Sequence, residues 1–146
     1  MYIKHGQFVT TIVFKDYRNN KMNSWTISEK RGGFEVYAQV ICMGDDLLVI
    51  LSGGTIHIGA IAMAQPRPSL ADPKNISATS SVFTYVGHKE DILIKSISEE
   101  LSIQLNRKTV VVAGIHWDRL APSDIKAITG ICSKLTRRIA KEVSKE

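Results

Sequence analysis

Residues 110–118 read Val-Val-Val-Ala-Gly-Ile-His-Trp-Asp, an apolar run rich in β-branched residues that ends in polar groups. Its length and composition are typical of a buried strand. Because side chains alternate along a strand, His116 and Asp118 lie on one face if the strand continues that far. α/β proteins often place their chemistry at the carboxyl edge of a sheet, and this run predicts such an edge. The alternative is a core strand whose last residues simply begin a loop.

The composition is that of an ordinary globular protein. The 146 residues, 44% hydrophobic and 23% charged, fit one domain, which we expect to span residues 1–146. No apolar run approaches the length of a membrane span, and residues 1–7 lack the apolar core of a signal peptide. The cysteines, Cys42 and Cys132, form no CxxC spacing. We therefore expect a cytoplasmic protein with reduced, packed cysteines and no membrane partner.

The net charge of +5 and the isoelectric point of about 9.3 are compatible with an anionic ligand or nucleic acid. Much of the excess positive charge falls in the C-terminal helical stretch, where cations complement the helix dipole. No recognition helix, aromatic RNA-binding pattern or zinc-finger spacing is present. We therefore expect no nucleic-acid partner.

The order of the predicted elements indicates an α+β fold. Apolar alternation and turn residues predict strands at residues 8–14, 24–28, 34–43, 47–51, 55–64, 79–86 and 110–115. Helical patterns cover residues 88–105 and the chain after Ala121-Pro122. This order predicts a mainly antiparallel mixed sheet with a C-terminal β-α-β-α unit and helices on one face. Residues 65–78 contain three prolines and predict a loop of more than a dozen residues.

The strand expected at residues 55–64 has small side chains on one face. Ala60, Ala62 and Ala64 share that face, and Gly59 precedes them. Small residues let a helix or a ligand come close to the backbone. Helix-on-sheet packing is the commoner explanation, and the sequence leaves both open.

Three histidines are expected at one edge of the sheet. The predicted strand, helix and strand between residues 79 and 115 form a crossover, so the two strands run parallel and their carboxyl ends lie together. His88 follows the first of these strands and His116 ends the second. The strand at residues 55–64 precedes residues 79–86 and is expected to run antiparallel to it, which brings His57 to the same edge.

Three imidazoles at one edge predict a site for a divalent transition metal ion. The candidate ligands are His57, His88 and His116, with Asp118 as a fourth ligand or as a partner that orients a histidine. No HxxxH or CxxC spacing supports the site, so each histidine could equally be an ordinary hydrogen-bonded polar group.

The same edge could bind an anion. Residues 88–90 begin the predicted helix, where free N–H groups favour phosphate. Arg67, Ser80, Ser81 and Lys89 are near this point in sequence and could add hydrogen bonds. Each of them, taken alone, could instead be an ordinary strand or loop residue.

Five blocks of the sequence resemble the LpdD-like family, whose members are small accessory proteins of gallate- and vanillate-type decarboxylases. The resemblance covers about residues 47–139. The blocks are Gly54-Thr55-Ile56-His57-Ile58-Gly59-Ala60, Ala64-Gln65-Pro66-Arg67-Pro68, Ser80-Ser81-Val82, Gly87-His88-Lys89-Glu90-Asp91 and Val112-Ala113-Gly114-Ile115-His116-Trp117-Asp118.

This resemblance implies a chaperone that binds reduced prenylated FMN in a metal-dependent way. Its partners would be a UbiD-like decarboxylase and a flavin prenyltransferase, and we expect a homo-oligomer. By position, the metal candidates are His57, His88 and His116. The candidates for the flavin phosphate and its surroundings are Arg67, Ser80, Ser81, Lys89 and Glu90.

Two other functions stay open at this point. One is a small metal-dependent hydrolase in which Glu90 or Asp118 acts as general base on a metal-bound water. The other is a purely structural component of a decarboxylase complex. The chain has no GxGxxG or Walker loop, so flavin binding is implied by the resemblance alone.

Overall fold

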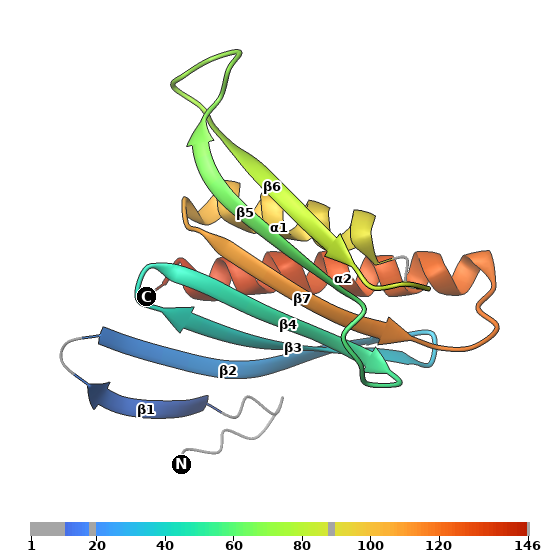
Figure 1. Cartoon of the computed structure of the whole chain (residues 1–146). Coiled ribbons are helices and arrows are strands. Elements are labelled where there is room, and N and C mark those ends of the chain that lie inside the picture. The colour runs from blue at the N-terminus through green and yellow to red at the C-terminus, as the bar shows by residue number, and fades with distance from the viewer. Residues whose placement is uncertain (1–10, 18–19, 88–89, 146) are drawn as a thin grey trace.

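The structure is a computed structural model that describes residues 11–17, 20–87 and 90–145. Seven strands form one sheet, in the order β1-β2-β3-β4-β7-β5-β6 (Figure 1). The strands are β1 (Thr11–Tyr17), β2 (Asn20–Arg31), β3 (Phe34–Met43), β4 (Asp46–Gly54), β5 (Ala60–Pro68), β6 (Ile76–Thr84) and β7 (Thr109–His116), and the helices are α1 (Asp91–Leu105) and α2 (Pro122–Val143).

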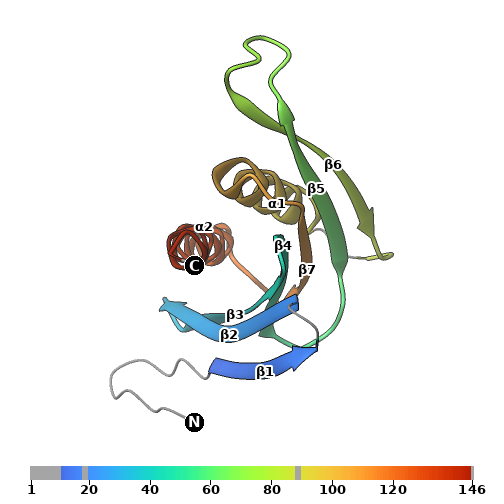
Figure 2. The same ribbon diagram turned by 90° about the vertical axis from the view of Figure 1, so that its left-hand side faces the viewer.

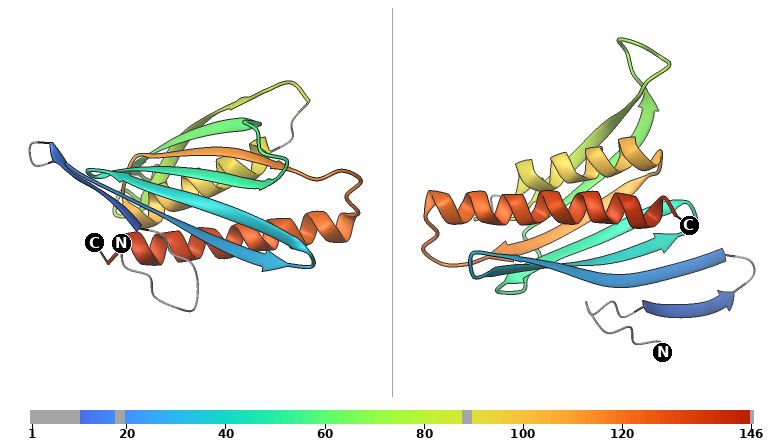
Figure 3. Two further views of the ribbon diagram at one scale, coloured as in Figure 1. Left: turned by 90° about the horizontal axis from the view of Figure 1, so that it is seen from below. Right: turned by 180° about the vertical axis from the view of Figure 1, so that it is seen from behind.

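The predicted α+β class is confirmed. All neighbouring strands pair antiparallel except β4 and β7, which pair parallel. Both helices cover the same face of the curved sheet (Figures 2 and 3). α1 packs against β5, β6 and β7, whereas α2 packs against β2 and β3. Among the described residues, the opposite face of the sheet carries no helix, and we call it the helix-free face.

Strict alternation of side chains explains how the core is built. In β3, Val36, Ala38 and Val40 are fully buried beneath the helices, while Tyr37 and Gln39 point to the helix-free face and are exposed. The helices add Leu101 and Leu135, which are also fully buried. Each such aliphatic side chain contributes about 1.5–3 kcal/mol by leaving water.

β2 is longer than the sequence predicts, and β1 is displaced. The strand expected at residues 24–28 is the twelve-residue β2, which forms a hairpin with β3 through Gly32 and Gly33. Both glycines have positive φ, 58° and 83°, a conformation that other residues rarely adopt. The predicted first strand is displaced to Thr11–Tyr17, and its expected residues 8–10 lie outside the described part of the chain.

The long proline loop predicted at residues 65–78 is wrong. β5 continues to Pro68 and β6 begins at Ile76, so only residues 69–75 join them. β5 pairs with β7 only as far as Ala64. Beyond that point one side of β5 is an edge, where the missing N–H of a proline removes no ladder bond. β5 also starts later than predicted, at Ala60, because residues 55–59 form a loop.

The described residues include no helix that is long and apolar enough to cross a membrane. Cys42 and Cys132 are both free and buried, as predicted. Burial raises the pKa of the Cys132 thiol to about 12, so it remains protonated and unreactive at neutral pH.

An ion-pair cluster fastens α2 to the sheet. Glu29 of β2 accepts hydrogen bonds from Arg138 and from Lys134, whose Nζ lies 2.7 Å from Oε2. Arg138 also donates to the carbonyl oxygen of Ser28 at 3.0 Å. Burial tends to raise the pKa of Glu29, but the hydrogen bonds and charges of Lys134 and Arg138 outweigh it, so the pKa lies below 4.5.

We predict that Glu29→Gln lowers the free energy of unfolding at pH 7 by about 1–3 kcal/mol, because it weakens two charge-assisted hydrogen bonds. A pKa that is lower in the folded state stabilises the fold above the unfolded pKa, and that contribution disappears as the pH falls below the folded pKa. The difference between wild type and variant should therefore shrink between pH 5 and pH 3 in urea titrations. Glu35→Gln is the matched control: its partner Lys30 is 73% exposed, so its effect at pH 7 should be smaller. Equal losses in the two variants would contradict the prediction.

Candidate metal and ligand site at the carboxyl edge of the sheet

The sheet brings four chain segments to one edge, which we call the carboxyl edge: the ends of β4, β6 and β7 and the start of β5. β6 and β7 run in the same direction, as predicted, although β5 lies between them. The loop of residues 55–59 crosses the end of β7. It is held by hydrogen bonds from Thr55 N to His116 O (2.9 Å) and from Gly59 N to Ala113 O (2.8 Å).

Two glycines make this crossing possible. A Cβ on Gly114 would lie 1.7 Å from the carbonyl oxygen of His57, and one on Gly54 would lie 1.9 Å from that of His116. Both neighbours are backbone atoms, which cannot rotate away as a side chain would. The glycines therefore determine where the two histidines are placed.

His57 and His116 meet at this edge, as the sequence predicts. Their ring centroids are 6.1 Å apart and the rings are nearly perpendicular. His57 Nδ1 lies 2.8 Å from the carbonyl oxygen of Thr55. A carbonyl can only accept, so Nδ1 carries the proton and, in the neutral ring, Nε2 has the lone pair. A backbone carbonyl that fixes the tautomer in this way is the usual companion of a metal-binding histidine.

Glu90 lies beside His57. Its Oε1 is 3.5 Å from His57 Nε2, and the side chain is 11% exposed. Glu90 is the residue before the first turn of α1 and packs over Gly59, where a Cβ would lie 2.8 Å from Oε1. The small residue noted in the sequence therefore makes room for this carboxylate.

Asp118 is paired with His116 rather than with His57. Its Oδ1 lies 3.2 Å from His116 Nε2, and the carboxylate is 89% exposed. This contact suits a carboxylate that orients an imidazole, the second of the two roles expected for Asp118. The intervening Trp117 packs edge-on against Phe34, with the ring centroids 5.1 Å apart, and anchors the end of β7.

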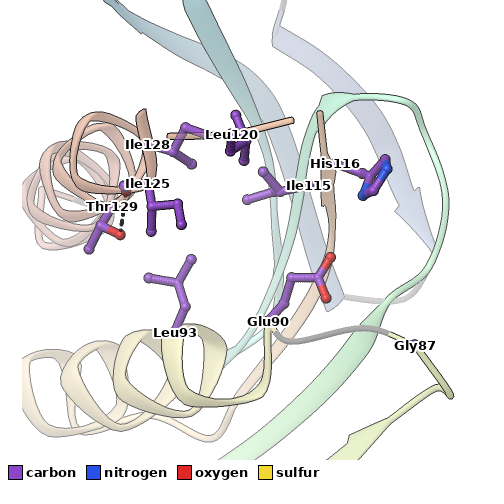
Figure 4. Close-up of a pocket in the computed structure, with 9 residues that line it drawn as sticks. All are labelled: Gly87, Glu90, Leu93, Ile115, His116, Leu120, Ile125, Ile128 and Thr129. Atoms are coloured by element: carbon purple, nitrogen blue, oxygen red, sulfur yellow. Dashed lines mark hydrogen bonds between the residues drawn. The ribbon is translucent and has the colours of Figure 1, made fainter. Parts of the chain in front are cut away.

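A pocket of about 370 Å³ adjoins Glu90 and His116 (Figure 4). Its apolar wall comes from both helices and from the segment that joins β7 to α2. The lining residues are Gly87, Glu90, Leu93, Ile115, His116, Leu120, Ile125, Ile128 and Thr129. Ile125 and Ile128 of α2 both line the pocket, and Ile125 is 54% exposed. The lining comes from segments far apart in the sequence, so no local sequence pattern identifies the pocket.

The donor atoms fit the expected metal ion in part. Within residues 11–17, 20–87 and 90–145, no three His, Cys, Asp or Glu side chains are close enough together to hold a metal. His57, Glu90 and His116 nevertheless provide the nitrogen and oxygen donors that divalent transition ions prefer. His88 and Lys89 lie outside the described residues.

Three predicted phosphate-binding residues lie on β5 and β6 away from the carboxyl edge, which is formed by the start of β5 and the end of β6. Arg67 is seven residues beyond Ala60, about 23 Å along the strand. It donates to Thr79 Oγ1 at 2.7 Å and to Pro68 O at 3.0 Å. Ser80 donates to Glu99 of α1 at 2.5 Å. Ser81 lies opposite Met63, exposed on the helix-free face.

Similarity to known proteins extends over most of the chain. Residues 30–144 match the family described as "Prenylated flavin chaperone LpdD-like domain". Protein LpdD of Lactiplantibacillus plantarum (strain ATCC BAA-793 / NCIMB 8826 / WCFS1) is 24% identical over 115 residues, which are 78% of this chain and 81% of that protein.

A solved structure, the "Crystal Structure of a Novel Chaperone Complex for Yeast 20S Proteasome Assembly", is similar over 89% of this chain and 96% of the other. The sequence identity is 14% and the TM-score is 0.39, too low for a shared fold to be inferred.

We predict that Gly114→Ala lowers the free energy of unfolding by about 3 kcal/mol or more, because its Cβ forces the His57 backbone to move. Gly130→Ala is the matched control. Its Cβ would meet only the end of the flexible Arg31 side chain, at 3.1 Å, and alanine favours a helix by up to about 1 kcal/mol over glycine. Chemical denaturation measures both. A Gly114→Ala protein as stable as wild type would show that the loop crosses β7 less closely.

Proposed function

Because this chain belongs to the family of prenylated flavin chaperone LpdD-like domains, we propose that it binds reduced prenylated FMN in a metal-dependent way and helps to deliver it to a UbiD-like decarboxylase. A flavin prenyltransferase would supply the cofactor. The observation that supports the proposal most directly is the arrangement of the carboxyl edge, where two histidines and a carboxylate adjoin an apolar pocket.

His57, Glu90 and His116 are the described residues that would hold the metal ion. His57 presents Nε2 towards Glu90 because its Nδ1 donates to Thr55. Asp118 orients the His116 ring. His88 follows β6 in the sequence and is the proposed third histidine. A bound divalent ion would supply a positive charge that anchors an electron-rich atom of the ligand.

The pocket is the proposed site for the apolar part of the ligand. Its volume of about 370 Å³ is within the range of small-molecule sites, and Leu93, Ile125 and Ile128 give it an apolar wall. A prenyl-derived group is apolar and gains about 0.8 kcal/mol for each methylene that leaves water. Plain FMN lacks that group, so the pocket would favour the prenylated flavin.

The phosphate would lie near the start of α1. The free N–H groups of the first helical turn favour an anion there. Lys89, which precedes Glu90 in the sequence, is the cation that we propose for it. Arg67 has no part in this arrangement, since it lies at the far end of β5.

We predict that wild type loaded with a divalent transition ion binds reduced prenylated FMN, and that removal of the metal weakens binding at least tenfold, or about 1.4 kcal/mol. His57→Ala and His116→Ala should lose metal and cofactor affinity together. Glu90→Gln should also lose affinity, whereas Glu100→Gln, further along α1 and bonded to Gln104, should not. Anaerobic titration and plasma mass spectrometry measure the two quantities.

Transfer is tested by adding the loaded protein to an apo UbiD-like decarboxylase and following decarboxylation. Binding that is indifferent to both the metal and the prenyl group would overturn the chaperone proposal. Turnover of an ester or amide by the metal-loaded protein alone would favour the hydrolase, and an absence of both binding and turnover would favour a structural component.

We further predict that Ile125→Trp, which fills the pocket, weakens binding of prenylated FMN at least tenfold and of plain FMN much less. Ile125 lines the pocket, and the larger side chain would displace the apolar group. Ile103→Trp is the matched control, because Ile103 is a partly exposed isoleucine near the other end of α1. The same titrations give both affinities. If the variant weakened the binding of both flavins equally, the prenyl group would have to bind outside this pocket.

A further inference from the structure

β6 is an edge strand with the composition of an interior strand. It pairs with β5 on one side and with no described strand on the other. The thirteen residues from Asn75 to Gly87 contain no charged residue, and β6 has no proline. Its register with β5 is regular over all nine residues. A long, uncharged, regular edge strand exposes unpaired N–H and C=O groups to any other strand.

The opposite edge of the sheet is protected in the usual ways. β1 contains Lys15 and Asp16, and its register with β2 shifts between Phe14 and Tyr17. Charges and bulges of this kind prevent another strand from pairing. β7, an interior strand, lacks Lys, Arg, Asp and Glu, as β6 does. β6 therefore lacks the features that keep the opposite edge strand from pairing with another chain.

Exposed apolar side chains gather along the same edge. Phe83 is 62% exposed on the helix-free face and packs edge-on against Tyr85, with the ring centroids 5.2 Å apart. Val86, directly after them, is fully exposed, and Ile76 at the other end of β6 is 42% exposed. Phe83, Tyr85 and Val86 therefore form a run of exposed apolar side chains at the end of β6, and such a run is available for an interface.

We propose that β6 pairs antiparallel with β6 of a second copy of this chain, so that two sheets join into one across a two-fold axis near Ser80. Such an axis brings identical residues close together. If the strand carried charged residues, like charges from the two copies would meet and repel each other, in a protein whose net charge is already +5. β6 avoids this repulsion because it is uncharged, which favours a second copy over a partner of opposite charge.

Pairing along β6 would extend over its nine residues, about 30 Å. It would satisfy the row of N–H and C=O groups that the free edge exposes. The aromatic pair of Phe83 and Tyr85 would be the apolar part of this contact.

Lysine or glutamate at Ser81 tests the proposal, because Ser81 is exposed and next to the expected axis. Wild type should sediment as a dimer, with twice the chain mass of 16.2 kDa. Ser81→Lys and Ser81→Glu should each raise the dimer dissociation constant at least tenfold, because the two like charges would lie diagonally across the two-fold axis. An equal mixture of the two variants should dimerise again, which shows that both are folded.

Gln39→Lys is the matched control, since Gln39 is exposed on the same helix-free face but in the interior strand β3. It should remain a dimer. A wild-type protein that is monomeric at micromolar concentration would overturn the proposal. The proposal would also be overturned if β6 of that monomer paired only with a decarboxylase. A dimer that dissociates with Gln39→Lys but not with the Ser81 variants would also overturn it and would indicate stacking of the two sheet faces.

Discussion

The arrangement of residues at the carboxyl edge depends on one steric constraint. This constraint is the contact between the backbone of Gly114 in β7 and the carbonyl of His57 in the loop of residues 55–59. A methyl group at Gly114 would occupy the space of that carbonyl oxygen. The same approach repeats between Gly54 and the carbonyl of His116. These two contacts set the position of the loop against β7. The backbone of His57 and the backbone of His116 are therefore both held in place at the carboxyl edge. Rigid support of this kind is what a precisely shaped binding site needs.

The fold could be predicted largely because its strands obey a simple period. β3 matches the predicted residues 34–43, since its buried and exposed side chains alternate without a break. The prediction was wrong at residues 65–78, where Pro66 and Pro68 suggest a loop. β5 can contain these prolines because β7 stops pairing with β5 at Ala64. That end point is set by the tertiary structure, and no local sequence pattern shows it. The position of β5 between β6 and β7 is likewise not visible in any local sequence pattern.

The site was predictable only in part, for a related reason. Strand direction alone places His57 and His116 at one edge, and the structure confirms their proximity. Nearness in sequence was a poor guide for Arg67, because each residue of an extended strand moves the chain about 3.3 Å further away. The pocket combines side chains from α1, β7 and α2, so its existence depends on how the helices pack. Glu90 was identified as a candidate, but its position against Gly59 was not.

The single parallel pair has a consequence for how the chain folds. Leu47 of β4 pairs with Thr109 of β7, so the two paired residues are 62 positions apart in the sequence. β1 to β4, in contrast, are joined by short hairpins that can close within microseconds. Closing the long loop costs conformational entropy that the central ladder must offset, so contacts between distant parts of the sequence slow folding. The meander of β1 to β4 is therefore expected to form first, and docking of β7, which also completes the carboxyl edge, to be the late step.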